Sequence, residues 1–164
     1  MSEKSTEPSG LFHWNLDKLA DALKISKNDV KEYFTDGRRI SFILERRLAR
    51  EVMTGSIATS EGAGYDLIDS HKHKWEVRSI SKDGVYFSPS YMVGSGRSFD
   101  KTGFLDKLSK IAGFILSDIV SFPDVPFWIV STSEVRAWWD SGTLGKNAAI
   151  SREKVLALLS GQQK

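Results

Sequence analysis

Three charged residues within 61–80 have the types and the spacing of a metal-dependent hydrolytic site. Two short apolar runs in this segment flank a polar tip rich in histidine and lysine, a pattern that predicts a β-hairpin. If the tip centres on His71, Asp66 lies opposite Glu76, and opposed residues of neighbouring strands share one face of a sheet. The period-2 alternation of a strand adds Arg78 to that face. We therefore expect the two acids and the arginine to converge.

Two carboxylates on a rigid sheet are suited to holding a divalent cation against a phosphodiester. Burying two acids beside one cation is costly unless they hold a metal or pair with a partner. In a simpler alternative, Asp66 and Glu76 only form a cross-strand salt bridge with Arg78 on a solvated face of the sheet. The elements predicted around the hairpin favour the metal site.

Those elements predict an α/β (α+β) fold with a central mixed sheet of four to five strands flanked by helices. Apolar residues at helical spacing predict helices within 15–34 (a pair, the second capped by Ser26 and Asp29), 40–53, 103–119, a helix begun by Ser131 and Glu134, and 152–159. The predicted strands are the two of the hairpin, then 85–88 and 127–131. The last is continuously apolar, which is typical of a buried central strand.

Composition is that of one globular domain. The 164 residues suffice for a sizeable core, and we expect a disordered polar tail at 1–10, an N-terminal helical segment at 11–37 packed on the core, and a catalytic core at 38–164. The chain has no cysteine, which excludes disulfides and thiolate metal ligands and is compatible with the cytoplasm. No apolar run approaches the roughly 18 residues of a membrane span, and the tail lacks the apolar stretch of a signal peptide.

The order of helix, three strands, helix and strand, with an acid on the first hairpin strand and Glu-x-basic on the second, resembles the PD-(D/E)XK nuclease superfamily. Type II restriction endonucleases are the most similar members, and the resemblance spans residues 40–135. Asp66 matches the first acid of the family motif, Glu76 the second, and Val77 the apolar spacer.

The resemblance implies a restriction endonuclease-like fold and Mg²⁺ bound by Asp66 and Glu76. It implies sequence-specific hydrolysis of double-stranded DNA by a homodimer, since a two-fold dimer matches a palindromic site. It also implies an assisting glutamate on the helix before the hairpin. Glu45 is the matching residue, and Glu51 is the alternative because the sequence does not fix the rotation of that helix.

Arg78 departs from the family, which usually has lysine at this position. A guanidinium stays charged at any working pH and is a poor proton acceptor. We expect Arg78 to contact the scissile phosphate and a metal-bound water of lowered pKa to provide the hydroxide. A slow or inactive nuclease is the open alternative.

Cations cluster locally although the net charge is only +2. Contacts between such cations and DNA phosphates would give salt-dependent and sequence-blind affinity for DNA. The alternative for the same residues is a solvated surface. The predicted DNA contacts are Arg38, Arg39, Arg46, Lys72, Lys74 and Arg97.

The helix pair within 15–34 resembles a helix-turn-helix, so a DNA-binding regulator with an inactive nuclease-like body is a second hypothesis. A repair or junction-cleaving nuclease of the same superfamily is a third.

Other candidate sites are weaker. Asp69 lies near the hairpin tip, where Asp-Ser is ordinary turn chemistry. His71 and His73 alternate along that tip as zinc ligands would, but solvated charge is the favoured interpretation. The run 94–97 lacks the lysine and hydroxyl residue of a phosphate-binding loop, so we expect no nucleotide cofactor.

Overall fold

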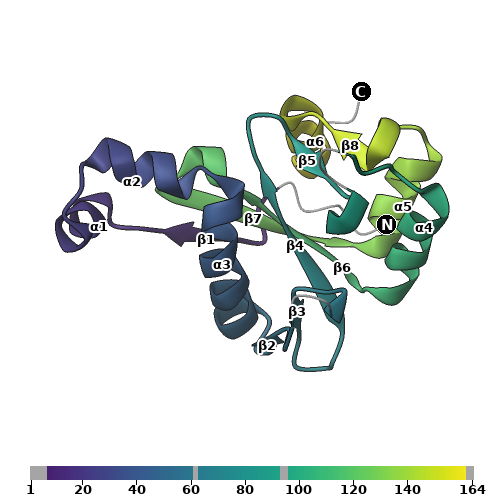
Figure 1. The fold of residues 1–164 in the computed structure, drawn as a ribbon, viewed down its shortest axis with the longest axis horizontal. Helices are drawn as coiled ribbons and strands as arrows, with labels where there is room; N and C mark the ends of the chain where they lie inside the picture. The colour runs from purple at the N-terminus through teal and green to yellow at the C-terminus, as the bar shows by residue number, and fades with distance from the viewer. Residues whose placement is uncertain (1–6, 61–62, 93–95, 162–164) are drawn as a thin grey trace.

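The computed structural model describes residues 7–60, 63–92 and 96–161 (Figure 1). A six-stranded sheet forms its centre, in the order β1-β7-β6-β4-β3-β2. The strands are β1 Gly10–His13, β2 Ser56–Ile57, β3 Leu67–Ile68, β4 Lys74–Ile80, β6 Gly113–Asp118 and β7 Asp124–Ser131. The β4–β6 pair is parallel and the other neighbouring pairs are antiparallel. The predicted mixed α+β class is thus confirmed, with six strands in the sheet where we expected four to five.

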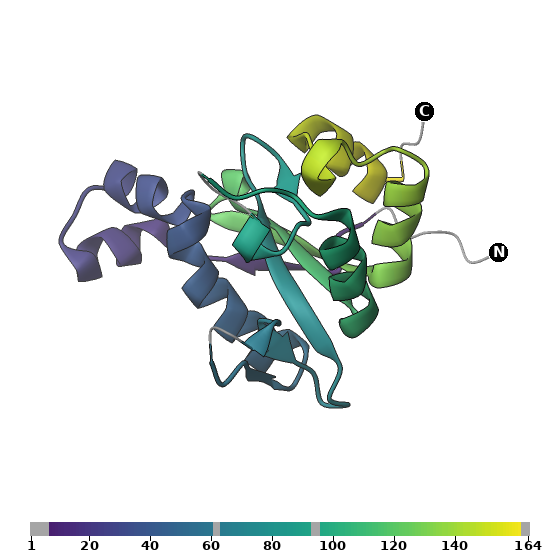
Figure 2. The ribbon, with the colours of Figure 1, turned by 45° about the vertical axis from the view of Figure 1, so that its right-hand side comes forward.

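Helices cover both faces of the sheet, as Figures 1 and 2 show. One face carries α3 and, towards one end, α1 and α2; the other carries α4, α5 and α6. Their bounds are α1 Leu16–Leu23, α2 Lys27–Phe34, α3 Gly37–Arg47 continued by the π-helical turn Leu48–Val52, α4 Lys101–Lys110, α5 Thr132–Asp140 and α6 Arg152–Leu159. A two-stranded sheet of β5 (Val85–Tyr86) and β8 (Ala149–Ile150) lies on the second face.

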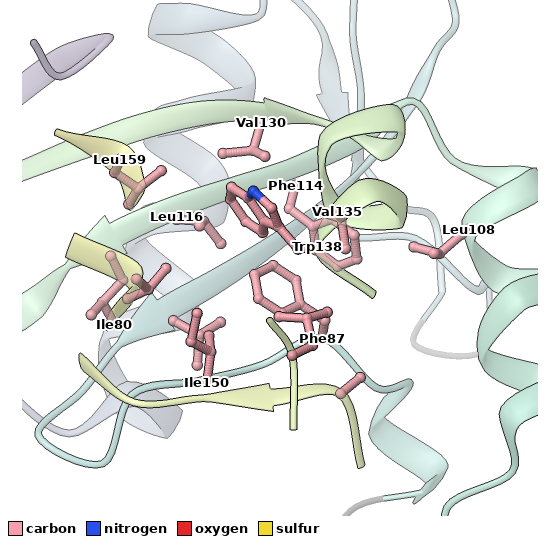
Figure 3. Close-up of a cluster of buried hydrophobic side chains, with 14 of the residues drawn as sticks. Ile80, Phe87, Leu108, Phe114, Leu116, Val130, Val135, Trp138, Ile150 and Leu159 are labelled. Atoms are coloured by element: carbon pink, nitrogen blue, oxygen red, sulfur yellow. The ribbon is translucent and has the colours of Figure 1, made fainter. Parts of the chain in front are cut away.

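The alternation of β6 divides the apolar residues into two cores. Phe114 and Leu116 point into the core under α4, α5 and α6, where Trp138 and Phe87 also pack (Figure 3). Ile115 points into the opposite core, against α1, α2 and α3. Because both faces of β6 are covered, all six of its residues are buried.

Local signals in the sequence correctly predict most of the helices. Ser26 and Asp29 form a capping box at the start of α2, and Ser131 and Glu134 form another at the start of α5. Each box satisfies backbone N–H groups that the first turn of a helix leaves without partners. The last helix, α6, has the predicted bounds.

The helix predicted for 103–119 is wrong in its second half. The helix α4 ends at Lys110, and 113–118 form the central strand β6. A short apolar run fits a strand buried on both faces as well as it fits a buried helix. The strand predicted for 127–131 is present within the longer β7, but β7 alternates between buried and more exposed residues, and β6 is the most buried strand.

Besides β6, two further strands of the sheet were not predicted, and one predicted strand lies elsewhere. Gly10 belongs to β1 and not to a disordered tail, because it pairs with Phe127 of β7; residues 1–6 of that tail lie outside the described residues. The segment 54–60, for which no strand was predicted, contributes β2. The strand predicted for 85–88 is limited to β5, which pairs with β8 and not with the main sheet.

Among the described residues, none of the helices has the length and apolar character needed to cross a bilayer.

A substitution at Gly113 tests experimentally whether this residue begins strand β6 or continues a helix. A Cβ added there would lie 2.1 Å from the Val130 carbonyl oxygen, so we expect Gly113→Ala to lower the free energy of unfolding by roughly 1–3 kcal/mol through overpacking. In a helix the same change would raise it by about 1 kcal/mol. Urea unfolding measures the sign. Gly37→Ala in the first turn of α3 is the control, because its Cβ would lie 3.4 Å from Ser79 Cβ, an ordinary contact.

Candidate active site

The β3–β4 hairpin has the predicted register. Leu67 pairs with Trp75 and Ile68 with Lys74, so the turn centres on His71. Immediately before β3, the Asp66 amide donates to the Trp75 carbonyl at 3.0 Å, and its own carbonyl accepts from Ala58 at 2.8 Å. The backbone of Asp66 is thus held by strands on both sides, and its side chain stands beside Glu76.

Glu76 is a buried carboxylate held by two cations. It is 4% exposed, so its charge needs strong compensation. Arg78 Nη1 lies 2.9 Å from its Oε2, and the ammonium of Lys107 pairs with its Oε1. Lys107 comes from α4, on the face of the sheet that Glu76 and Arg78 share. Sequence reasoning missed Lys107, because its contact spans 31 positions and depends on where β6 places α4.

Arg78 is fixed to the backbone around the site. Its Nε donates to the Tyr86 carbonyl at 3.2 Å, Nη2 to the Ser88 carbonyl at 3.4 Å, and Nη1 to the Val77 carbonyl at 3.3 Å. These bonds connect β4 to β5 and to the segment after it. Arg78 therefore supports the backbone around the site and also contributes a positive charge to it.

Asp66 caps the open edge of β4. Its Oδ2 accepts from the Val77 amide at 2.7 Å and lies 3.9 Å from Arg78 Nη1. Burial, followed by the nearby charge of Glu76, raises the pKa of Asp66 to about 7, although the Val77 amide and Arg78 oppose the rise. The structure thus brings Asp66, Glu76 and Arg78 together, as predicted.

Glu45, and not Glu51, is the helix glutamate near this group. Burial raises the pKa of Glu45; Arg46 opposes the rise and Glu76 adds to it, which shows that Glu45 is within electrostatic reach of the site. Glu51 instead forms a two-pronged ion pair with Arg47, at 2.5 and 2.9 Å. The hydrogen bond from Arg47 lowers the pKa of Glu51.

The donor set suits a hard divalent cation. Mg²⁺ in proteins is commonly held by one or two carboxylates, with water and substrate phosphate completing the shell. Asp66 and Glu76 supply two carboxylates. A bound cation would offset the burial of these acids and the repulsion between them. Within the ranges that the structure describes, no group of three or more His, Cys, Asp or Glu side chains could hold a metal ion.

Asp69 has the turn role that the sequence predicts. It accepts from the His71 and His73 amides at 2.8 and 2.9 Å and from Trp75 Nε1 at 3.0 Å. Although burial opposes the shift, the hydrogen bonds from Trp75, His73 and His71 lower the pKa of Asp69 to about 2. This carboxylate holds the hairpin tip in shape and does not join Asp66 and Glu76.

The predicted DNA contacts lie on α3, on the β3–β4 hairpin and in the segment before α4. Arg38 and Arg39 are exposed in the first turn of α3, Arg46 stacks on the ring of Phe42 at 3.4 Å, and Lys74 lies 5.3 Å from the ring of Tyr65. Lys72 is exposed at the hairpin tip, and Arg97 donates to the Ser90 carbonyl at 3.0 Å. In the described part of the chain, no hydrogen bond or ion pair joins these six to Asp66 or Glu76.

Comparison of the chain with protein-family models, curated proteins and solved structures finds no match. The chemistry that this site can support is therefore inferred from the geometry of its own residues.

Asp66 makes the stability of the metal-free protein depend on pH. A carboxyl whose pKa rises from 3.8 to about 7 on folding binds its proton more tightly in the folded state, so its stabilising effect is complete below pH 4 and is lost as the pH rises through 7. Between pH 5 and 8.5 in EDTA we expect a loss of roughly 2 kcal/mol in the free energy of unfolding. Asp66→Asn should remove this loss, measured by urea unfolding against the unmodified chain.

Asp69→Asn is the matched control for this measurement. Because the Asp69 carboxyl stays ionised at both pH values, its removal should lower the stability equally at pH 5 and 8.5. An unchanged pH dependence in Asp66→Asn would contradict the assignment of the raised pKa to Asp66.

Proposed function

We propose that this protein is a Mg²⁺-dependent endonuclease that hydrolyses phosphodiester bonds in double-stranded DNA, as a sequence-specific restriction enzyme of the cytoplasm. The observation that carries the proposal is the convergence of Asp66 and Glu76 near Arg78 Nη1, at 3.9 and 2.9 Å, on strands in the predicted register.

The succession of elements supports a restriction endonuclease-like fold. From α3 the chain runs through β2, β3 and β4 of the main sheet and β5 of the small sheet to α4 and β6. The elements of the main sheet and its helices thus follow in the order of helix, three strands, helix and strand. The first acid stands directly before β3, and Glu-x-basic lies on β4. The three predicted strands were the two of the hairpin followed by 85–88. In the structure the three are β2 followed by the two of the hairpin, and the two acids keep their places in the order.

In the proposed reaction, water adds across the P–O3′ bond of the DNA backbone. The water oxygen bonds to phosphorus, and the 3′ oxygen departs with the bonding electron pair and takes up a proton. Bound Mg²⁺ would polarise the phosphate and lower the pKa of the attacking water. Asp66 and Glu76 would hold the ion, and Glu45 would add negative charge next to it. Arg78 orients Glu76 through its 2.9 Å contact with Oε2.

The exposed cations Arg38, Arg39 and Lys72 would guide the DNA backbone towards this site. Each phosphate contact of this kind strengthens binding in a salt-dependent way and carries no sequence information. Cleavage of both strands at a palindrome would require a homodimer, which we propose as the active form.

A DNA-binding regulator with an inactive nuclease-like body is the second candidate. The observation in its favour is that Arg78 and Lys107 already neutralise Glu76, so Mg²⁺ must compete with two internal cations. In this case the helix pair α1–α2 would contact DNA. A repair or junction-cleaving nuclease is a third candidate, which differs from the first only in its substrate.

Incubation with unmethylated phage DNA and Mg²⁺ tests the proposal directly. We expect discrete fragments from the unmodified protein, and a loss of at least about 10²-fold in rate for Asp66→Asn and Glu76→Gln, because each removes one charged metal ligand. DNA affinity in a gel-shift measurement should persist in both variants. DNA binding without any cleavage by the unmodified chain would favour the regulator, and preference for four-way junctions over linear duplexes would favour the repair enzyme.

Glu45 and Glu51 provide a matched pair on one helical segment. We expect Glu45→Gln to slow cleavage about tenfold and to raise the Mg²⁺ concentration needed for half-maximal rate, because it removes negative charge from the site. Glu51→Gln should leave both quantities unchanged, since its carboxylate pairs with Arg47. Equal effects of the two changes would argue against a role for Glu45. Single-turnover rates over a Mg²⁺ titration provide the measurement.

A further inference from the structure

Two aromatic rings of α2 and α3 are exposed to solvent. Tyr33, near the end of α2, is 43% exposed, and Phe42, on α3, is 60% exposed. Phe42 lies on the face of α3 opposite to Ile40 and Leu44, which are fully buried in the core. Single apolar residues are common on a protein surface, but these two rings share a further feature, because each is in contact with an arginine.

The arginines stack on the two rings. The guanidinium carbon of Arg39 lies 5.4 Å from the centre of the Tyr33 ring, and that of Arg46 lies 3.4 Å from the centre of the Phe42 ring. Arg39, Phe42 and Arg46 are spaced by three and four residues, so they share one face of α3. Rings and cations therefore alternate along one exposed stripe of Tyr33, Arg39, Phe42 and Arg46, which we call the α3 stripe.

The next arginine along the chain shows the same contact in a closed environment. Arg47 lies 4.3 Å from the centre of the Phe12 ring, and Phe12 is only 5% exposed. Packing of the protein thus accounts for the Arg47 contact. Phe42 instead keeps most of its ring surface open to a ligand beside its arginine.

The charge around the α3 stripe is strongly positive. Residues 33–50 contain five arginines and two acids, a net charge of +3, whereas the whole chain carries +2. Such a concentration of positive charge attracts a polyanion, and an exposed ring offers a flat surface to the planar face of a base. Unpaired nucleic acid has both the charge and the free base faces, whereas a duplex keeps its base faces stacked inside.

We propose that the α3 stripe binds single-stranded nucleic acid, with bases stacked on Tyr33 and Phe42 and phosphates next to Arg39 and Arg46. Aromatic rings combined with neighbouring cations are the means by which proteins hold single strands with little regard to sequence. This site goes beyond the proposed cleavage of duplex DNA, because binding at the α3 stripe requires neither a metal ion nor the carboxylates of the candidate active site.

Binding of labelled oligonucleotides in EDTA tests the site without cleavage. Fluorescence anisotropy compares a DNA single strand, an RNA strand of the same sequence and the DNA duplex. We expect Phe42→Leu and Tyr33→Leu each to weaken single-strand binding at least about fivefold, because each removes one stacking surface. Duplex affinity should change by less than about twofold. A loss with the DNA strand, the RNA strand or both supports the proposal and identifies which nucleic acid the stripe binds.

Matched controls separate the rings from the charges. Tyr91→Leu removes a ring that is 63% exposed but lies outside the α3 stripe, so all affinities should remain unchanged. Arg39→Gln and Arg46→Gln should weaken single-strand binding and reduce its salt dependence, since each removes a cation next to a phosphate. Arg136→Gln, on α5 and paired with Asp140, should do neither. Urea unfolding checks that every variant remains folded.

A single strand with abasic sites in place of its bases separates stacking from charge. It should bind more weakly than the intact strand, and Phe42→Leu should not weaken it further. Equal affinity for the intact strand and for the abasic strand or polyglutamate would show that the stripe only attracts anions, which would overturn the proposal. Single-strand binding that neither Phe42→Leu nor Tyr33→Leu weakens would also overturn it. These results would leave the proposed cleavage of duplex DNA intact, and a failure to cleave would leave the α3 stripe intact.

Discussion

The buried carboxylate of Glu76 is the constraint on which the rest of the site depends. An ionised group that is 4% exposed is tolerated only when its charge is paired and its oxygens are hydrogen-bonded. Arg78 serves one oxygen and Lys107 the other. Since Lys107 belongs to α4 and Arg78 reaches the backbone of β5, this one charge fixes a helix, a long strand and a short strand relative to one another.

The two cations lie among several acids at this site. Three carboxylates, those of Glu45, Asp66 and Glu76, influence one another, and the pKa values of Glu45 and Asp66 rise in consequence of burial and of this proximity. A purely structural salt bridge on a solvated face would lower the pKa of its acids. The rise instead comes first from burial, to which the charge of the neighbouring carboxylate adds, a pattern that is common at functional sites.

The sequence predicts those parts of the site that depend on local rules. The register of the β3–β4 hairpin follows from the polar tip around His71, and the caps at Ser26 and Ser131 follow from side chains three residues apart. The strand β6 was missed because its apolar run continues the pattern of α4, and only its burial on both faces determines its conformation. Lys107 was missed for the same reason, since its place beside Glu76 depends on the return of the chain through β6.

The carbonyls around position 78 suit the arginine that stands there. A planar guanidinium satisfies Tyr86, Ser88 and Glu76 with separate nitrogens in a fixed geometry, which a single ammonium nitrogen could not do across the same span. Arginine therefore stabilises the connection between β4 and β5. Lys107 on α4 pairs with the other oxygen of the same carboxylate. Sequence spacing thus predicts the cation on β4, whereas the second cation reaches Glu76 only through the fold of the chain.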